Sequence, residues 1–402
     1  MSLLSVEEAL ARVLNGVAPT AAETVAVERA HGRVLAEPLK ALLTQPPFAA
    51  SAMDGYAVRA ADVAALPATL NVIGTAAAGH PFPGRVGGDE AVRIFTGGAV
   101  PEGADAVVIQ ENTDWDGLNL VVREGTVDAE YLRPRGMDFR EGDTLLEAGR
   151  RLGPRELALA AAMGHGTLSA RRRPRIAVLS TGDELVAPGL RPGPGQIVAS
   201  NHLGVAALAE AAGAEVSQLG IARDTREDLG AHLAKADAAD VLVTIGGVSV
   251  GEHDLVAGAL EAQGLMLAFW KVAIRPGKPL VFGRLGGSRV LGLPGNPAAS
   301  LVCARVLLVP LIWGLLGRPV EDSVRSVRAR ARVALEANGP RRHYMNAISR
   351  RGDDGVTEVT PLRDQHSSLI APLAQADCLL VRPPNAPPAA PGSLVPILPF
   401  DV

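Results

Sequence analysis

Three short apolar runs between residues 173 and 322 constrain the fold more than any other feature of the sequence. They lie at residues 176–179, 241–245 and 290–293, and segments with a helical pattern separate them. Short apolar runs between helices are typical of parallel strands that are buried on both faces of a sheet. We therefore expect a doubly wound α/β domain with helices at residues 201–212, 225–236, 254–263 and 297–316.

Each run ends in a loop rich in glycine and polar residues, at residues 180–184, 246–251 and 294–297. In open α/β sheets, ligands bind at the carboxyl ends of the strands, where the strand order reverses. Glycine-rich loops can bind anions through backbone N–H groups, although tight strand-to-helix turns also need glycine. The loops contain neither a Walker A motif nor a dinucleotide-binding glycine spacing. We expect them to contribute these substrate-binding residues: Thr181, Gly182, Asp183, Gly246, Gly247, Ser249, Gly251, Pro294, Gly295 and Asn296.

Acidic side chains follow the ends of the predicted strands. They are Asp183, Glu184, Asp224 and Asp254. Carboxylates beside a phosphate site commonly hold Mg²⁺, which retains several waters and bridges the protein to phosphate oxygens. Any one of them could instead cap a helix, and Asp254 stands at a helix start. Four carboxylates at the same edge of one sheet favour a metal-assisted anion site.

Three cations, Lys271, Arg275 and Lys278, lie within eight residues of a segment that Pro276 and Pro279 stiffen. The prolines restrict the backbone, so the charges can be held at fixed separations. A solvated surface loop is the alternative, but two prolines and an apolar flank favour phosphate or oxyanion binding.

The composition indicates a globular chain of several domains. At 402 residues, it exceeds the size that one core usually organises. Its formal charge of −4 and lack of a long basic run argue against nucleic acid or an anionic membrane as the main partner. The apolar run at 301–316 contains Arg305 and Pro310 and is shorter than a membrane span, so we expect a buried helix. The two cysteines have no metal or redox spacing, which fits a cytoplasmic location.

Changes of pattern along the chain suggest four domains. We expect an elongated helical domain at residues 1–44 and 148–172, in which the returning helix packs on the N-terminal helices. A β-rich domain at 45–147 is inserted into it, because short apolar runs there alternate with Gly and Pro turns. The α/β domain occupies 173–322. Residues 323–402 have a period-two pattern that predicts a small β-barrel or sandwich.

Seven motifs in the chain resemble those of the MoeA family of molybdenum insertases, in the same order. They are SAMDGYA at 51–57, FTGGAVPEGADAVV at 95–108, RPRGMD at 133–138, STGDEL at 180–185, GGVSVGEHD at 246–254, RPGKP at 275–279 and LPGNP at 293–297. The resemblance implies the same four domains, with a central domain like that of molybdopterin adenylyltransferases and a C-terminal β-barrel. It also implies a homodimer whose cleft joins the α/β domain of one subunit to the inserted domain of the other.

By the same resemblance, the substrates are adenylylated molybdopterin and molybdate, the cofactor is Mg²⁺, and the products are molybdenum cofactor and AMP. The catalytic positions would be Asp54, Thr96, Glu184, Asp224 and Asp254, and the last three would also hold the metal ion. Further binding positions would be Arg133, Asp138, Ser200, Asn201, Ser367 and Ser368. Partners would be small-molecule substrates and other molybdopterin-handling proteins.

The sequence departs from the family pattern at three positions. Arg275 stands where lysine is frequent, Asn346 stands where arginine is expected, and Ala199 stands where aspartate is common. Two alternatives therefore stay open: a molybdopterin adenylyltransferase, because the central domain is shared, and a non-catalytic cofactor carrier, because Asn346 removes a charge.

Overall fold

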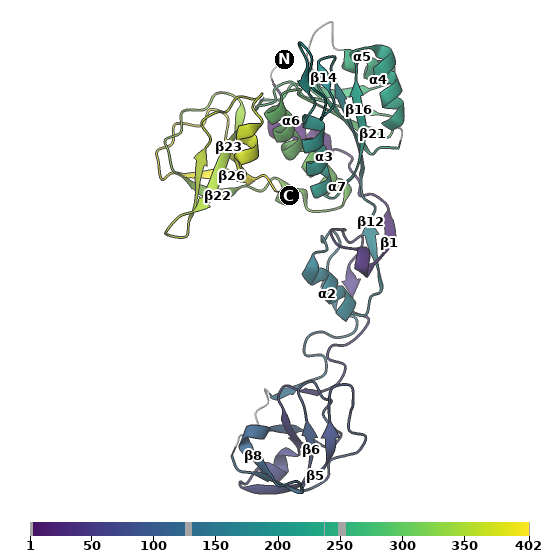
Figure 1. The fold of residues 1–402 in the computed structure, drawn as a ribbon, viewed down its shortest axis with the longest axis vertical. Helices are drawn as coiled ribbons and strands as arrows, with labels where there is room; N and C mark the ends of the chain where they lie inside the picture. The colour runs from purple at the N-terminus through teal and green to yellow at the C-terminus, as the bar shows by residue number, and fades with distance from the viewer. Residues whose placement is uncertain (1–2, 125–130, 237, 248–254, 402) are drawn as a thin grey trace.

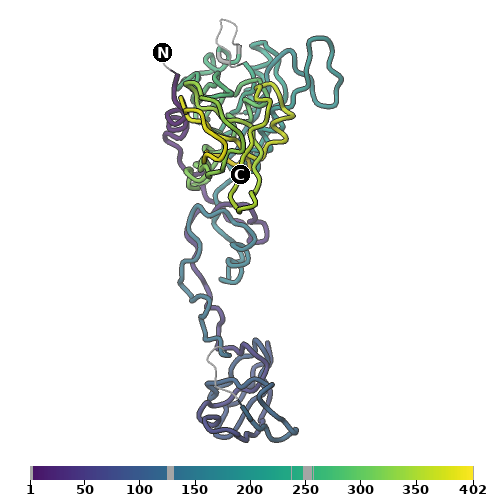
Figure 2. Tube along the Cα trace, turned by 90° about the vertical axis from the view of Figure 1, so that its left-hand side faces the viewer, coloured from purple at the N-terminus to yellow at the C-terminus, as the bar shows by residue number. Residues whose placement is uncertain are grey.

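The computed structural model is elongated, with three parts in a row (Figure 1). It describes residues 3–124, 131–236, 238–247 and 255–401. The α/β part and the C-terminal β part lie together at one end, a small part with α2 lies in the middle, and the inserted β-rich part lies at the other end. Figure 2 shows the same shape from the side. The predicted residues Ser249, Gly251 and Asp254 lie outside the described residues.

The α/β part is built on one six-stranded sheet with the order β16-β13-β17-β21-β20-β18. The strands are β13 (Arg175–Thr181), β16 (Glu215–Ala222), β17 (Val241–Ile245), β18 (Met266–Trp270), β20 (Val281–Leu285) and β21 (Ser288–Leu293). The first four strands in that order are parallel, and β20 pairs antiparallel with both of its neighbours, β21 and β18. The sheet therefore includes the three predicted parallel strands but is mixed.

Helices cover both faces of this sheet, as predicted. Alternate residues of β13 explain why: Ile176 and Val178 pack in one core with α3 (Asn201–Ala211), whereas Ala177 and Leu179 pack in another with α4 (Arg226–Leu233). The first face also carries α6 (Pro297–Cys303) and α7 (Val309–Leu315), and the second carries α5 (Leu255–Ala262). Both faces of each central strand are buried, so the apolar runs are continuous.

The predicted long apolar helix spans Pro297–Leu315. Its most apolar 18-residue stretch has a mean hydropathy of 2.0, and 89% of that stretch is buried. It is long and apolar enough to cross a membrane, but its packing in the core accounts for that composition. A π-helical segment, Ala304–Leu308, precedes Pro310. Proline lacks an N–H and clashes with the preceding turn, which a wider turn relieves. Arg305 is buried there and donates to Ser323 O (2.8 Å) and Pro399 O (3.1 Å).

The N-terminal helix α1 (Val6–Leu14) begins with a capping box between Ser5 and Glu8. Its apolar face packs in the α/β core beside α7, not against the returning helix α2 (Pro154–Ala162). The expected packing of α2 on the N-terminal helices is therefore wrong for α1, whereas α2 does contact the short 3-10 helix η1 (Val27–Arg29) of the same region. Instead, α2 closes a separate small core over two strands that pair with each other, β1 (Ala22–Ala26) and β12 (Thr167–Arg171). The same core includes residues near two further paired strands, β2 (Leu39–Lys40) and β11 (Thr144–Leu146).

The inserted part is a six-stranded sheet with the order β7-β4-β6-β5-β9-β8. Its strands are β4 (Gly55–Val58), β5 (Ala68–Ala76), β6 (Glu90–Ile94), β7 (Ala106–Ile109), β8 (Thr113–Trp115) and β9 (Asn119–Val122). A short ladder of β3 (Ala50–Ser51) and β10 (Leu132–Arg133) adjoins it in sequence. Two cores, one containing Leu70 and Leu120 and the other containing Ile94 and Val107, stabilise this part.

The C-terminal part is a closed five-stranded barrel, as predicted. Its strands are β22 (Val327–Ala331), β23 (Arg342–Arg351), β24 (Thr357–Pro361), β25 (Cys378–Arg382) and β26 (Leu394–Pro399). Pairing between β23 and β25 closes the barrel. Strand β19 (Ile274–Arg275), from the α/β part, pairs with the start of β23. That pairing brings the predicted cationic segment against the barrel.

Candidate functional site

The carboxyl ends of β13, β17 and β21 meet at one pocket of about 80 Å³, which we call the strand-end pocket. It is lined by Ser180, Thr181, Glu184, Leu185, Ile197, Val198, Ala199, Ser200, Asn201, Ile245, Gly246, Gly295 and Pro297. Backbone bonds join the loops around it: Gly182 N donates to Ala222 O, and Gly246 N donates to Leu293 O, both at 3.1 Å. In the described part of the chain, the predicted loops therefore converge.

Two glycines in this pocket region are required by geometry. Gly246 has φ +95°, and a Cβ there would lie 2.6 Å from Thr181 O. Gly247 has φ +60°, and a Cβ there would lie 2.2 Å from Val256 Cγ2. Only glycine avoids both the left-handed strain and the contact. The loop after β17 therefore approaches the loop after β13 more closely than a larger residue permits.

Three carboxylates gather beside the strand-end pocket. Asp224 N donates to Asp183 Oδ1 at 3.2 Å. Although the Asp224 side chain reaches solvent, its partial burial and the charges of Asp183 and Glu184 raise its pKa. A divalent cation would relieve this repulsion, and carboxylate oxygens are the ligands that Mg²⁺ prefers. Within the described residues, no group of three or more His, Cys, Asp or Glu side chains is already assembled as a metal site. The predicted ligand Asp254 is not among them.

A second, larger pocket of about 500 Å³ lies where the α/β part meets the barrel, and we call it the cationic pocket. It is lined by Arg275, Pro276, Gly277, Lys278, Pro279, Pro294, Asn296, Ala299, Arg341, Gln365, His366 and Ser367. The loop at 294–297 separates the two pockets: Gly295 and Pro297 face the first, and Pro294 and Asn296 face the second. One short loop is thus shared by both.

Hydrogen bonds fix this shared loop from both sides. On the strand-end side, Asn201 Nδ2 donates to Gly295 O at 2.7 Å. On the barrel side, Asn296 Nδ2 donates to Ser367 Oγ at 3.0 Å, and Ala298 N donates to Ser367 O at 2.9 Å. Ser368 Oγ lies 2.7 Å from His366 Nδ1 instead. Of the predicted serine pair, only Ser367 lines the pocket.

The predicted cations are placed differently from one another. Arg275 and Lys278 are exposed and line the cationic pocket. Lys271 lines neither pocket, and its Nζ lies 4.9 Å from the centre of the Trp270 ring. Arg341 also lines the cationic pocket but was not among the predicted binding residues. No sequence pattern singled it out, because it directly precedes β23, a strand that was itself not predicted.

The inserted part carries a separate set of predicted residues. Asp54 Oδ1 accepts hydrogen bonds from Thr96 N (2.7 Å) and Thr96 Oγ1 (2.9 Å), and these bonds lower the pKa of Asp54. Arg133, opposite Ala50 in the β3–β10 ladder, and Asp138 are exposed. Asp54, Thr96 and Arg133 come from the inserted part, which forms the end of the molecule opposite the α/β part and the barrel (Figure 1), whereas Asp138 precedes Phe139, which packs in the core with α2. A single chain therefore does not bring them together with Glu184.

Three family models match successive parts of the chain. Residues 4–164 match the MoeA N-terminal region (domain I and II), residues 177–313 match a probable molybdopterin binding domain, and residues 328–400 match the MoeA C-terminal region (domain IV). Together they span all four predicted parts in order.

Curated relatives and solved structures match over almost the whole length. The chain is 36% identical to a molybdopterin molybdenumtransferase of Haemophilus influenzae over 99% of each chain, and 36% identical to one of Nostoc sp. over 90% of this chain and 85% of the relative. A crystal structure of a molybdopterin biosynthesis MoeA protein from Pyrococcus horikosii superposes with a TM-score of 0.85 at 32% identity, covering 100% of both chains.

Proposed function

Since the chain belongs to the molybdopterin molybdenumtransferase family, a family of transferases that insert molybdenum into molybdopterin, we propose a specific form of that reaction for it. Its substrates are adenylylated molybdopterin and molybdate. The reaction depends on Mg²⁺ and releases AMP as molybdenum is inserted. The observation that carries this proposal is the pair of pockets on either side of the loop at 294–297.

The strand-end pocket suits the pyrophosphate-linked part of the substrate. Its lining includes Ser180, Thr181 and Ser200, whose hydroxyl groups can donate to anionic oxygens. Asn201 and Gly246 hold neighbouring loops close to it, so these donors are preorganised before substrate binds. Hydrogen bonds that strengthen as charge develops on a leaving phosphate would favour cleavage to AMP.

The acidic group beside that pocket suits the cation. Glu184 and Asp224, with Asp254, would hold Mg²⁺. When bound, the ion would neutralise phosphate oxygens and act as a Lewis acid toward the pyrophosphate. Without it, the carboxylates of Asp183, Glu184 and Asp224 repel one another and any anionic substrate.

The cationic pocket suits molybdate, a tetrahedral dianion. Arg275 and Lys278 supply positive charge, and Ser367 supplies a hydroxyl group on the opposite wall. Because the two pockets share one loop, an oxyanion in the second lies next to a pterin that extends from the first. This proximity is what insertion needs, since it makes the encounter of the two substrates effectively intramolecular.

We infer that the active unit is a homodimer. Asp54, Thr96, Arg133 and Asp138 line neither pocket of their own chain, yet Thr96 fixes Asp54 as an ionised, partly exposed carboxylate. The inserted part of one copy can therefore complete the pockets of another. Sedimentation of the purified chain at the mass of a dimer supports this arrangement, and a strictly monomeric active species contradicts it.

The reaction itself is tested by incubating the purified protein with adenylylated molybdopterin, molybdate and Mg²⁺. The proposal expects AMP release and formation of active cofactor, both abolished by a chelator. Tight binding of the substrate without AMP release would instead favour a carrier. Adenylylation of molybdopterin from ATP would favour an adenylyltransferase.

A further inference from the structure

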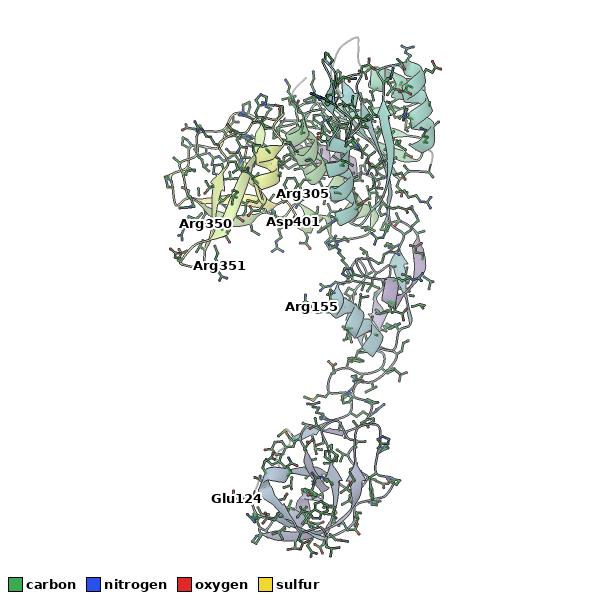
Figure 3. The ribbon with its side chains drawn as sticks, viewed as in Figure 1. Glu124, Arg155, Arg305, Arg350, Arg351 and Asp401 are labelled. Atoms are coloured by element: carbon green, nitrogen blue, oxygen red, sulfur yellow. The ribbon has the colours of Figure 1, made fainter. Side chains whose placement is uncertain are left out.

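Arg305 is a buried cation at the junction of the α/β part and the barrel, and Figure 3 shows it between the two. It belongs to the π-helical segment Ala304–Leu308 of the long apolar helix, and it is only 3% exposed. Burial lowers its pKa to about 10, so the guanidinium is still charged at pH 7. Among the described residues, no carboxylate lies within 4.0 Å of its charged nitrogens. A buried charge of this kind depends on other polar partners.

Those partners are two backbone carbonyls at the two ends of the barrel. Arg305 Nη1 donates to Ser323 O at 2.8 Å, and Arg305 Nε donates to Pro399 O at 3.1 Å. Ser323 ends α8 (Val320–Ser323), which leads into the first barrel strand, and Pro399 ends the last barrel strand, β26. One side chain of the α/β part therefore holds the chain where it enters the barrel and where it leaves it.

The same helix also contacts the barrel at the cationic pocket. Ala298 N, in its first turn, donates to Ser367 O at 2.9 Å, and Ser367 lines that pocket. Ala298 and Arg305 are about 10 Å apart along a helix, at 1.5 Å per residue. The β19–β23 pairing joins the barrel to the wall that carries Arg275. These contacts hold the barrel beside the pocket, whereas Arg305 holds its chain ends and so limits its rotation about them.

We propose that Arg305 is a positioning residue for oxyanion binding, because it docks the barrel so that Ser367 faces the cations of the cationic pocket. This inference rests on the proposed use of that pocket for molybdate. Arg305 does not line the pocket, so its effect must pass through the barrel. A guanidinium suits this task because its N–H donors point in fixed directions and can hold two carbonyls at a set separation.

The test is a double-mutant cycle on molybdate binding, measured by calorimetric titration of the full-length protein with sodium molybdate. The four proteins are the wild type, Arg305→Met, Ser367→Ala and the double variant. Methionine keeps a long unbranched side chain in the core but cannot donate to either carbonyl. We expect Arg305→Met to weaken molybdate binding by about tenfold or more, since a displacement of about 1 Å at a binding group can cost that much.

The cycle shows whether Arg305 acts through Ser367. Ser367→Ala should weaken binding much less in the Arg305→Met background than in the wild type, because a displaced Ser367 no longer meets the anion. Additive losses, or wild-type affinity in Arg305→Met, would overturn the positioning role. Arg305→Lys should recover part of the affinity, because an ammonium group can still donate to the carbonyls, and it replaces Arg305→Met in the cycle if that variant does not fold.

Arg318→Met is the matched control for the loss of a buried arginine. Arg318 follows the same helix, its Cζ lies 3.2 Å from the centre of the Trp313 ring, and burial lowers its pKa to about 10 as well. This variant should lower the melting temperature but change molybdate affinity less than about twofold. A loss of affinity as large as that of Arg305→Met would show that lower stability alone explains both, which would overturn the inference.

A second readout separates this inference from the proposed function. None of the residues that line the strand-end pocket belongs to the barrel. In the AMP-release assay, Arg305→Met should therefore raise the KM for molybdate and leave the KM for adenylylated molybdopterin within about twofold. Equal increases in both KM values would overturn the role of Arg305 alone. Absence of molybdate binding by the wild-type chain would overturn the assignment of the pocket and the inference together.

Discussion

Replacing Gly246 with alanine should destabilise the α/β domain, because this residue allows two strand-end loops to touch. Its φ of +95° costs an alanine about 1 kcal/mol. The added Cβ would lie 2.6 Å from Thr181 O, a backbone atom that cannot rotate away. Overpacking of this kind costs about 1–3 kcal/mol. The expected total is a decrease of about 2–4 kcal/mol in the free energy of unfolding. AMP release should also be lost, because the wall of the strand-end pocket moves.

Gly230→Ala is the matched control, because the same methyl group is added in α4, where it would meet no atom within 4 Å. A helical glycine replaced by alanine should gain about 0.5–1 kcal/mol. The assay is urea unfolding followed by tryptophan fluorescence in a Trp115→Phe background, which leaves Trp270 and Trp313 as reporters in the α/β domain. Equal unfolding midpoints for the two alanine variants would refute the steric argument.

Two further predictions concern ionisable groups. The raised pKa of Asp224 means that its ionised form destabilises the folded state. The contribution of Asp224 to the free energy of unfolding therefore falls as the pH rises above about 3.8, its ordinary pKa. Asp224→Asn should therefore raise the melting temperature of the metal-free protein at pH 7 but not at pH 3. The same variant should slow AMP release more than about tenfold. A lower melting temperature of Asp224→Asn at pH 7 would contradict the predicted repulsion. Burial raises the pKa of the Cys303 and Cys378 thiols to about 12, so neither should react with a disulfide reagent at pH 8 until the protein unfolds. Rapid labelling of the folded chain would show that a thiolate is accessible.

The central strands were predictable because burial on both faces leaves a continuous apolar signal. β13 has this signal from Ile176 to Leu179, and β17 is buried at every position. By contrast, β16 is mostly exposed or half-buried at the sheet edge, and β20 contains Gly283 and Arg284. Apolar and polar residues do not alternate regularly along β23, which carries arginines at both ends. Edge strands and charged strands depend on partners that a local pattern does not contain.

The N-terminal helix illustrates a different limit. The spacing of Val6, Leu10, Val13 and Leu14 predicts an apolar face. The structure has such a face, in which Val6, Ala9 and Val13 are buried. The pattern does not say which core receives that face. Its packing beside α7 is a tertiary contact over some 300 residues of sequence, so the expected neighbour, α2, was wrong.

The strand-end pocket was predictable in outline, and the cationic pocket only in part. Loops that follow parallel strands must meet at one edge, which brought Thr181, Gly246 and Gly295 together. Arg341 and Ser367 reach the second pocket because the barrel docks on β19, and no periodicity encodes that docking. The roles of residues in the inserted part came from family resemblance alone.

The most direct test of the composite site is complementation between two inactive variants. Asp54→Ala damages the inserted part, and Glu184→Ala damages the strand-end pocket. If each site takes one residue from each subunit, half of the dimers in an equilibrated equimolar mixture pair one variant with the other, and each of these has one intact site. A site shared between two subunits predicts AMP release by the mixture at about one quarter of the wild-type rate, although neither variant is active alone. A mixture that stays inactive after subunit exchange would contradict it.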